Sequence, residues 1–317
     1  MMRRREFLGT AAALALTPQI VQAAAKMGDI PIIDTHVHLF DSRRPQGVPY
    51  AGSPEWAKDM KGVALPATYD AYAKPLNIVG AIELEASPWV EDNLWVLEQM
   101  ETDTRFVGTV GDLEPEKPEF ADLFNRFRKN PMFLGIRCGN IWDRDVSKLE
   151  NDPRFLDGLK RLADADMVMD TANPTIALLE TMVRIHDKLP TLRIVLDHLP
   201  QLDPADEKAY ADVLKEIKSR GTIYAKLSEI DHRSMKARGM AAHKARLDQL
   251  IETFGEDRVV FGSDWPNSWG TATPAEIVKV ARAYFATRSR EAAEKYFWKN
   301  TLAVYKGKKR AAKQPAL

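Results

Sequence analysis

Two histidines, His36 and His38, stand two residues apart in the apolar segment "IIDTHVHLFD", which covers residues 32–41. Aliphatic and β-branched residues of this kind favour a buried strand, and successive side chains of a strand point to opposite faces. The two imidazoles are therefore predicted to share one face, with Asp34 one layer below them. Such a pair can hold a metal ion or form hydrogen bonds to a substrate oxygen.

Polar side chains also stand at the ends of other apolar segments. They include a third imidazole, that of His198, and the carboxylate of Asp264 in "FGSDWP". Brought together with the histidine pair, they would form a ligand set for one divalent ion or an acid–base set. Taken singly, His198 could be a hydrogen-bonded core histidine and Asp264 a helix cap. The other polar residues at such ends are Glu83, Glu85, Arg137, Asp170, Asn173, Lys226 and Ser228.

The elements that must position these residues are eight apolar segments that alternate with amphipathic stretches. In residues 120–127, for example, apolar side chains recur with the i, i+3, i+4, i+7 spacing of a helix. The alternation predicts an α/β fold, a (β/α)8 TIM barrel, in which active sites occupy the C-terminal ends of the strands. An open, doubly wound sheet is the alternative, but no segment is followed by a glycine-rich dinucleotide fingerprint. The segments cover residues 31–39, 77–86, 105–113, 132–139, 166–172, 192–199, 221–228 and 258–265.

Some of the polar residues are better suited to binding a substrate than to reacting with it. The planar guanidinium of Arg137 matches a carboxylate or a sugar hydroxyl, and Lys226 is a second cationic anchor. Both could instead form ion pairs with Glu83 or Glu85 inside the barrel mouth. The long segment 42–74 is interpreted as a loop over that mouth. The candidate substrate-binding residues are Arg137, Glu85, Lys226, Asp170 and, in this loop, Tyr50.

The composition excludes several classes of partner and site. Lys and Arg number 45, as do Asp and Glu, and the formal net charge of +0 gives no electrostatic case for a nucleic-acid partner. A hydrophobic content of 45% and a charged content of 28% are typical of a globular protein. The single cysteine, Cys138, excludes an internal disulfide framework and a cysteine-rich zinc site. The expected partner is a small-molecule substrate.

The chain is predicted to divide into three parts. Residues 1–25 combine "RRREFLG", an Ala/Leu-rich run and a small-residue end, which resembles a twin-arginine export signal. The apolar run is shorter than the roughly 20 residues that cross a bilayer, so no membrane span is expected. Instead we expect recognition by the twin-arginine export machinery and a periplasmic location. Residues 26–306 are assigned to the barrel, and the basic residues 307–317 to a disordered tail.

Six motifs along the chain resemble the amidohydrolase superfamily. They are closest to its amidohydrolase-related branch (amidohydrolase 2), which includes sugar lactonases and 2-pyrone-4,6-dicarboxylate lactonase. The motifs "IDTHVHLFD", "ELEA", "GIRC", "VLDHLP", "KLSE" and "RVVFGSDWP" follow one another between residues 33 and 266. The resemblance implies a TIM barrel with the histidines and Asp264 at its active site.

The resemblance also bears on the metal content. Two-metal members of the superfamily have a bridging lysine at the end of the fourth strand, where this chain has Arg137. They also have a histidine on the fifth strand, which is absent from "MVMDTAN" here. We therefore expect one divalent, zinc-like ion or no metal. The possible ligands are His36, His38, His198 and Asp264.

Together these features predict the hydrolysis of a lactone, the cyclic ester of a sugar acid or of a dicarboxylate. Asp264 would act as general base on the attacking water, and the histidines would stabilise the oxyanion directly or through an ion. One alternative is a metal-dependent decarboxylase on the same barrel, and another is a non-catalytic periplasmic binding barrel. The expected catalytic residues are Asp264, His36, His38 and His198.

The export signal leads to a first prediction. Changing Arg4 and Arg5 together to lysine should leave the protein in the cytoplasm, because twin-arginine signals are read through this pair. Cell fractionation followed by N-terminal sequencing measures the outcome, with Arg43→Lys as the control. Periplasmic protein that still begins at Met1 would contradict a cleaved signal.

Overall fold

The structure is a computed structural model, and it describes residues 18–49, 62–202, 204–231, 238–270 and 272–316. The predicted substrate-binding residue Tyr50 lies outside these ranges. Part of the predicted export signal is described as helix α1 (Pro18–Ala25), which contacts helix α10 (Pro274–Phe285). The export signal itself stays a prediction.

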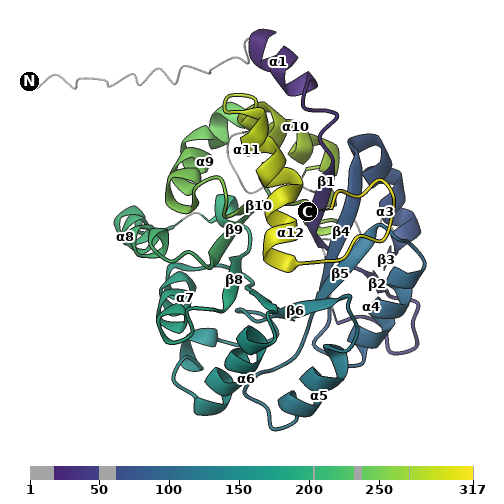
Figure 1. Cartoon of the computed structure of the whole chain (residues 1–317), viewed down its shortest axis with the longest axis vertical. Coiled ribbons are helices and arrows are strands. Elements are labelled where there is room, and N and C mark those ends of the chain that lie inside the picture. The colour runs from purple at the N-terminus through teal and green to yellow at the C-terminus, as the bar shows by residue number, and fades with distance from the viewer. Residues whose placement is uncertain (1–17, 50–61, 203, 232–237, 271, 317) are drawn as a thin grey trace, which may run out of the picture.

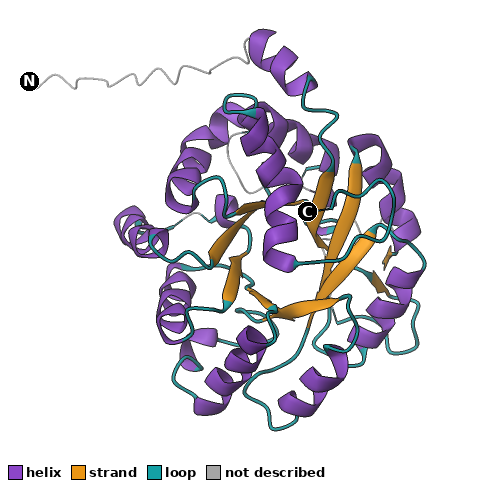
Figure 2. Cartoon of the chain, in the orientation of Figure 1, coloured by secondary structure: helices purple, strands orange, loops and turns teal. Residues whose placement is uncertain are grey.

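Eight parallel strands form a ring in which each strand pairs with the next (Figure 1). The first and last strands meet through a parallel bridge between Val37 and Trp265. Helices connect the strands around the outside of the ring, so the predicted (β/α)8 TIM barrel is confirmed (Figure 2). The strands are β1 (Ile32–Val37), β4 (Ile78–Leu84), β5 (Phe106–Gly111), β6 (Phe133–Arg137), β7 (Val168–Asp170), β8 (Arg193–Leu196), β9 (Ile223–Ser228) and β10 (Val259–Gly262).

The connecting helices begin at caps that can be recognised in the sequence. At helix α6 (Pro153–Asp164) the Asp152 side chain accepts a hydrogen bond from the Arg154 backbone N–H, with Pro153 in the first turn. Helix α10 begins with a reciprocal capping box between Thr273 and Glu276. The remaining helices are α3 (Pro66–Ala73), α4 (Asp92–Glu101), α5 (Phe120–Phe127), α7 (Ile176–Lys188), α8 (Glu207–Lys218), α9 (Met240–Phe254), α11 (Arg290–Glu294) and α12 (Asn300–Tyr305).

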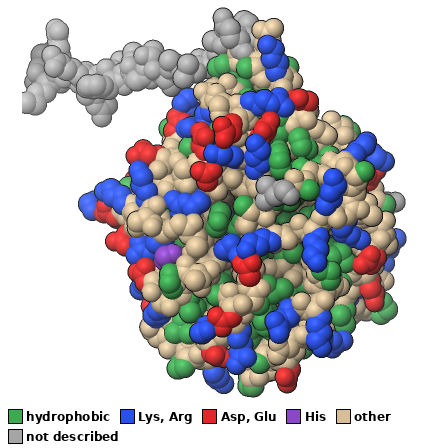
Figure 3. Space-filling model, in the orientation of Figure 1, with side chains coloured by type: hydrophobic (Ala, Val, Ile, Leu, Met, Phe, Trp, Pro, Cys, Tyr) green, Lys and Arg blue, Asp and Glu red, His purple; other side chains and the backbone are tan. Residues whose placement is uncertain are grey.

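Short elements complete the fold. Strands β2 (Phe40–Asp41) and β3 (Val63–Ala64) form a separate antiparallel pair in the segment after β1. Among the described residues, no helix has the length and apolar character needed to cross a bilayer. Figure 3 shows acidic and basic side chains interspersed on the face it views, in agreement with the balanced composition. The single-turn elements are η1 (Lys74–Leu76), η2 (Val146–Lys148), η3 (Leu199–Gln201), η4 (Asn267–Gly270) and the π-helical η5 (Lys295–Lys299).

Helix α12 helps to close one end of the barrel. Its Val304 and Tyr305 pack in a cluster with buried side chains from seven of the strands, among them Ile33 of β1 and Val195 of β8. In Figure 1 this helix lies across the ring of strands. Because Tyr305 is almost fully buried and carries a hydroxyl, it needs a hydrogen-bond partner inside the barrel.

The position of Asp34 corrects the strict alternation expected for β1. Its Oδ2 accepts a 2.7 Å hydrogen bond from the Tyr69 hydroxyl of α3, and its Oδ1 accepts a 2.8 Å bond from the backbone N–H of Ser263. Asp34 therefore points to the helix layer and does not share the face of His36 and His38. The reason is local, because the pairing of β1 with β4 shifts register between Asp34 and Val37.

The C-terminal segment corrects a second prediction. Residues 307–316 are not a disordered tail, because they pack against the barrel near the start of β5. The Arg310 Nη1 donates a 2.7 Å hydrogen bond to the Phe106 carbonyl. The side chain of Gln314 is only 2% exposed, and its Nε2 donates a 2.8 Å bond to the Thr104 carbonyl. The basic composition of this segment predicted disorder, and it could not reveal the hydrogen-bond partners because they lie about two hundred residues earlier in the chain.

Gln314 is therefore expected to contribute to stability. Its replacement by alanine should lower the free energy of unfolding by about 2 kcal/mol, because the partly buried carbonyls of Val79, Thr104 and Arg105 each lose a hydrogen bond. Chemical denaturation measures the change, and Lys313→Ala, at an exposed neighbouring position, is the control. Equal stability of the two variants would mean that the segment does not dock in solution.

Candidate active site

A cavity of about 680 Å³ opens at the C-terminal ends of the strands, within the size range of small-molecule sites. Five of the predicted site residues line it, whereas His36 is fully buried beneath its floor. The lining residues are His38, Glu85, Arg137, Ile141, Trp142, Asn173, Pro174, Thr175, His198, Gln201, Leu202, Glu229, Asp264 and Asn267.

Three atoms crowd together at the floor of this cavity. The Nε2 atoms of His36 and His38 are 3.2 Å apart. The Oδ1 of Asp264 lies 3.3 Å from the first nitrogen and 3.1 Å from the second. The end of β1 supplies the two imidazoles and the turn after β10 supplies the carboxylate, so the predicted convergence of these three residues is observed.

Unusual backbone conformations aim several of these side chains. His198, Glu229 and Asp264 have φ values of 53°, 50° and 56°, in the left-handed region that non-glycine residues seldom adopt. Each follows the last residue of its strand closely, at the rim where β8, β9 and β10 end. Backbone strain of this kind concentrates at functional sites, where it directs a side chain that a regular strand could not present.

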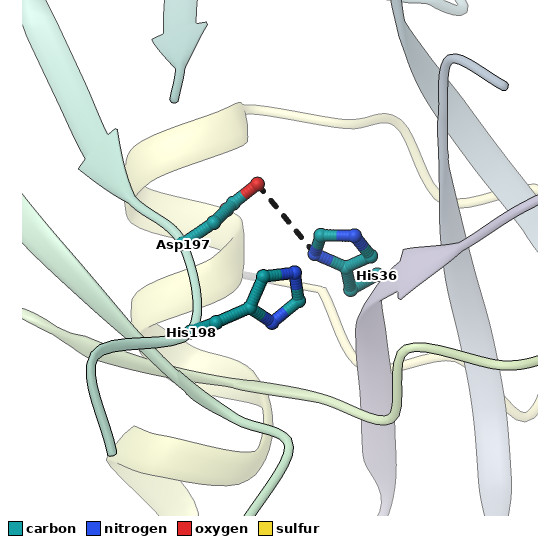
Figure 4. Close-up of side chains that lie close together, drawn as sticks. All are labelled: His36, Asp197 and His198. Carbon is teal, nitrogen blue, oxygen red and sulfur yellow. Dashed lines mark ion pairs between the residues drawn. The ribbon is translucent and has the colours of Figure 1, made fainter. Parts of the chain in front are cut away.

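Asp197 and His198 extend the cluster from the end of β8 toward His36, as Figure 4 shows. The Oδ2 of Asp197 lies 3.7 Å from the Nδ1 of His36. The imidazole of His198 lies beside that of His36, with ring centroids 4.3 Å apart, and its Nδ1 is 2.8 Å from the Ser228 hydroxyl. The predicted site histidines thus come together in one buried group.

Lys226 and Asp170 do not line the cavity, which corrects their predicted role as direct substrate ligands. Both are fully buried below the floor. The Lys226 Nζ donates a 2.8 Å hydrogen bond to Asp170 Oδ2 and lies 2.9 Å from Asp197 Oδ1. The ammonium group is therefore paired, as one alternative held, but its partners are these aspartates and not Glu83 or Glu85.

Arg137 and Glu85 form part of the cavity wall, as predicted. The Nη2 of Arg137 is 3.3 Å from Asp197 Oδ2, and its Nη1 is 3.6 Å from Glu85 Oε1. The indole Nε1 of Trp142 donates a 2.9 Å hydrogen bond to Glu85 Oε2. Arg137 thus joins the wall of the cavity to the buried Asp197, and Trp142 adds an aromatic surface.

Burial and neighbouring charges set the protonation states. Burial lowers the pKa of His198 to about 4 and that of His36 well below its ordinary value, with the nearby cation Lys226 adding to the effect on His36. The pKa of Asp264 lies below its usual range, because the attraction of His198 and His38 outweighs burial. Burial and the Asp264 charge raise the pKa of Glu229 well above its usual value. Asp264 is therefore ionised at neutral pH, and the imidazoles of His36 and His198 are neutral.

The crowded atoms fit one metal ion. Tetrahedral bonds of about 2.0–2.1 Å place ligand atoms about 3.3 Å apart, and two imidazoles with a carboxylate are a usual zinc donor set. The measured separations among His36, His38 and Asp264 are 3.1–3.3 Å. His198 lies in adjoining groups of possible ligands. The family resemblance places the ligands of a second ion on the fourth and fifth strands. These strands carry Arg137 and Asp170 here, and both side chains are engaged in ion pairs.

Among the residues of the site that were not assigned a role from the sequence, four lie next to the predicted ones or reach the cavity from loops. Asp197 precedes His198 in "VLDHLP", and Glu229 ends "KLSE", so proximity to an assigned strand end was the available signal. Trp142 and Asn267 lie in loops, where no spacing rule indicates that they reach the cavity.

Comparisons with known proteins agree with this geometry. The sequence profile of the amidohydrolase family (amidohydrolase 2) matches residues 33–307. The L-fucono-1,5-lactonase of Burkholderia multivorans is 26% identical over 288 residues, which are 86% of this chain and 94% of that protein.

Solved structures share the fold at lower identity. An amidohydrolase from Burkholderia multivorans with bound zinc superposes with a TM-score of 0.75, at 20% identity, over 88% of this chain and all of that one. A probable 2-pyrone-4,6-dicarboxylic acid hydrolase from Acinetobacter baumannii, with citric acid bound, has a TM-score of 0.67, at 16% identity. It covers 87% of this chain and 99% of its own.

The geometry sets an upper limit on the metal content. Purified protein should bind at most one zinc ion per chain, and His36→Asn or His38→Asn should weaken binding by tenfold or more, because even changes outside the ligand shell cost about 10–100-fold. Elemental analysis and zinc titration measure both effects. His186→Asn, on the outer helix α7, is the control. Two tightly held ions per chain would contradict the limit.

Proposed function

Because the chain belongs to the amidohydrolase 2 family, we propose that it hydrolyses a lactone, with Asp264 as the general base. The observation that carries the proposal is the position of this carboxylate. It lines a cavity large enough for a monosaccharide ring and lies 3.1–3.3 Å from two imidazole nitrogens. The curated lactonase that matches most of the chain supports the same class of reaction.

The proposed reaction begins with a water molecule at the cavity floor. The ionised Asp264 takes a proton from this water as its oxygen attacks the lactone carbonyl carbon. A tetrahedral oxyanion forms, and the carbon–oxygen bond of the ring then breaks. Asp264 or His198 returns the proton to the leaving alkoxide, so that the product is an open-chain hydroxy acid.

The imidazoles are placed to stabilise the oxyanion. A histidine N–H directed at the developing charge in a buried site stabilises the transition state more than it would in water. A bound divalent ion would polarise the lactone carbonyl and lower the pKa of its water. In either case His36 and His38 hold the reacting carbonyl next to Asp264.

The cavity wall favours a hydroxylated ring over a dicarboxylate as the substrate. Among the described residues that line the cavity, Arg137 is the only Lys or Arg side chain, and it is already paired with Asp197. A dicarboxylate would bring two further negative charges to this wall. Glu85 lines the cavity, and its Oε1 accepts no hydrogen bond within the described part of the chain, so a rotation of the carboxyl group lets a sugar hydroxyl donate to it. We therefore propose a sugar lactone.

The Asp264→Asn variant tests the mechanism. It should lower kcat for lactone opening by about 10²–10⁴-fold, the usual contribution of a general base, because the amide keeps the shape but cannot take a proton. A pH-stat assay over a panel of 1,4- and 1,5-sugar lactones and a pyrone dicarboxylate measures activity. Asp157→Asn, on the exposed face of α6, is the control.

The panel also separates the alternatives. Full activity of Asp264→Asn would contradict the proposed base. Release of CO2 from aromatic or pyrone acids, without lactone opening, would indicate a decarboxylase. Tight binding of a sugar lactone by the wild-type protein, without turnover, would indicate a binding barrel.

A further inference from the structure

Lys226 is a buried cation directly behind the imidazole of His36. Its Nζ lies 3.3 Å from the His36 Nδ1, on the side of the ring opposite the cavity-floor contacts. Lys226 is fully buried, and among the described residues the carboxylates of Asp170 and Asp197 are its other ionic contacts. An ammonium group carries three N–H donors and accepts no hydrogen bond, so Lys226 can meet the His36 Nδ1 only as a donor.

The contacts at the cavity floor indicate which atom of His36 carries a proton. The His36 Nε2 lies 3.3 Å from the Oδ1 of Asp264. An ionised carboxylate can only accept a hydrogen bond, so this contact is favourable when the His36 Nε2 carries the hydrogen.

The same assignment follows from the other side of the ring. If the proton of His36 is on Nε2, its Nδ1 is an acceptor, and this is the atom that faces the Lys226 ammonium. We propose that Lys226 is a positioning residue that fixes the tautomer of His36, with the proton on Nε2 at the cavity floor. The tautomer assignment is independent of the substrate, and only its use as an oxyanion donor rests on the proposed lactone hydrolysis.

Asp197 offers His36 a second arrangement. Neither of its side-chain oxygens has a well-aligned hydrogen bond from a described residue, although it is fully buried. Its Oδ2 is 3.7 Å from the His36 Nδ1, close enough to accept a proton donated from that nitrogen after a small movement. A histidine that binds a metal through Nε2 commonly donates its other N–H to a carboxylate. Lys226 thus favours the tautomer in which the His36 Nε2 is an N–H donor, whereas Asp197 favours the tautomer in which this nitrogen can bind a metal ion.

A link through α12 keeps Lys226 in place. The Tyr305 hydroxyl donates a 2.7 Å hydrogen bond to Asp170 Oδ2, the same oxygen that accepts from Lys226. Tyr305 closes the opposite end of the barrel and does not touch His36 in any described contact. Tyr305→Phe therefore perturbs the surroundings of Lys226 without removing its contact to His36, which makes it a matched control.

Nitrogen NMR of the metal-free protein tests the assignment directly. Long-range ¹H–¹⁵N spectra of protein labelled at its histidines separate protonated from unprotonated ring nitrogens, and the signals of His36 are those lost in His36→Asn. We expect Nε2 protonated and Nδ1 unprotonated in the wild-type protein. The reverse pattern, or two protonated nitrogens, would overturn the proposal, whatever the activity on lactones.

The Lys226→Met variant tests the cause. With the ammonium removed, the His36 signals should shift toward the tautomer protonated on Nδ1, and zinc titration should show tighter binding. Tyr305→Phe should keep the wild-type pattern. A folded Lys226→Met protein with unchanged His36 signals would overturn the role of Lys226. If that variant does not fold, the wild-type spectrum alone decides, because a Nδ1 facing Lys226 must be unprotonated.

Discussion

The site depends on one electrostatic constraint, the crowding of three acceptor atoms in a buried place. Two imidazole nitrogens and one ionised carboxylate oxygen, from His36, His38 and Asp264, lie 3.1–3.3 Å from one another. Lone pairs at such distances repel unless a proton or a cation lies between them, and burial makes the repulsion stronger. The same arrangement that needs a positive charge can therefore bind a metal ion or present an N–H to an oxyanion.

The surrounding structure holds these atoms together against their repulsion. The Asp34 carboxylate ties β1 to the backbone of Ser263, directly before Asp264, and so fixes the two strand ends relative to each other. Below the floor, Lys226 and Asp197 place a buried ion pair against His36. The barrel thus surrounds the reactive atoms with paired charges, because Lys226 is paired with Asp170 and Asp197 and Arg137 with Glu85 and Asp197.

Sequence patterns predicted the features that depend on residues close together in the chain. Strand and helix periodicity predicted the barrel, and strand ends predicted that His36, His38, His198 and Asp264 would meet. Contacts that depend on register around the ring could not be read in this way. The partners of Lys226, which lies on β9, come from β1, β7 and the end of β8, and the register shift in β1 turned Asp34 outward. Gln314 docks against carbonyl groups roughly two hundred residues earlier in the chain, which composition cannot reveal.

The central claim is that water, activated beside Asp264, attacks the acyl carbon of a lactone. Turnover in water enriched in ¹⁸O, followed by mass spectrometry of the product, tests it most directly. The account predicts one ¹⁸O atom in the new carboxylate and none in the hydroxyl released from the ring. Label in that hydroxyl would mean attack at the alkyl carbon. An unlabelled product, or loss of CO2, would contradict hydrolysis itself.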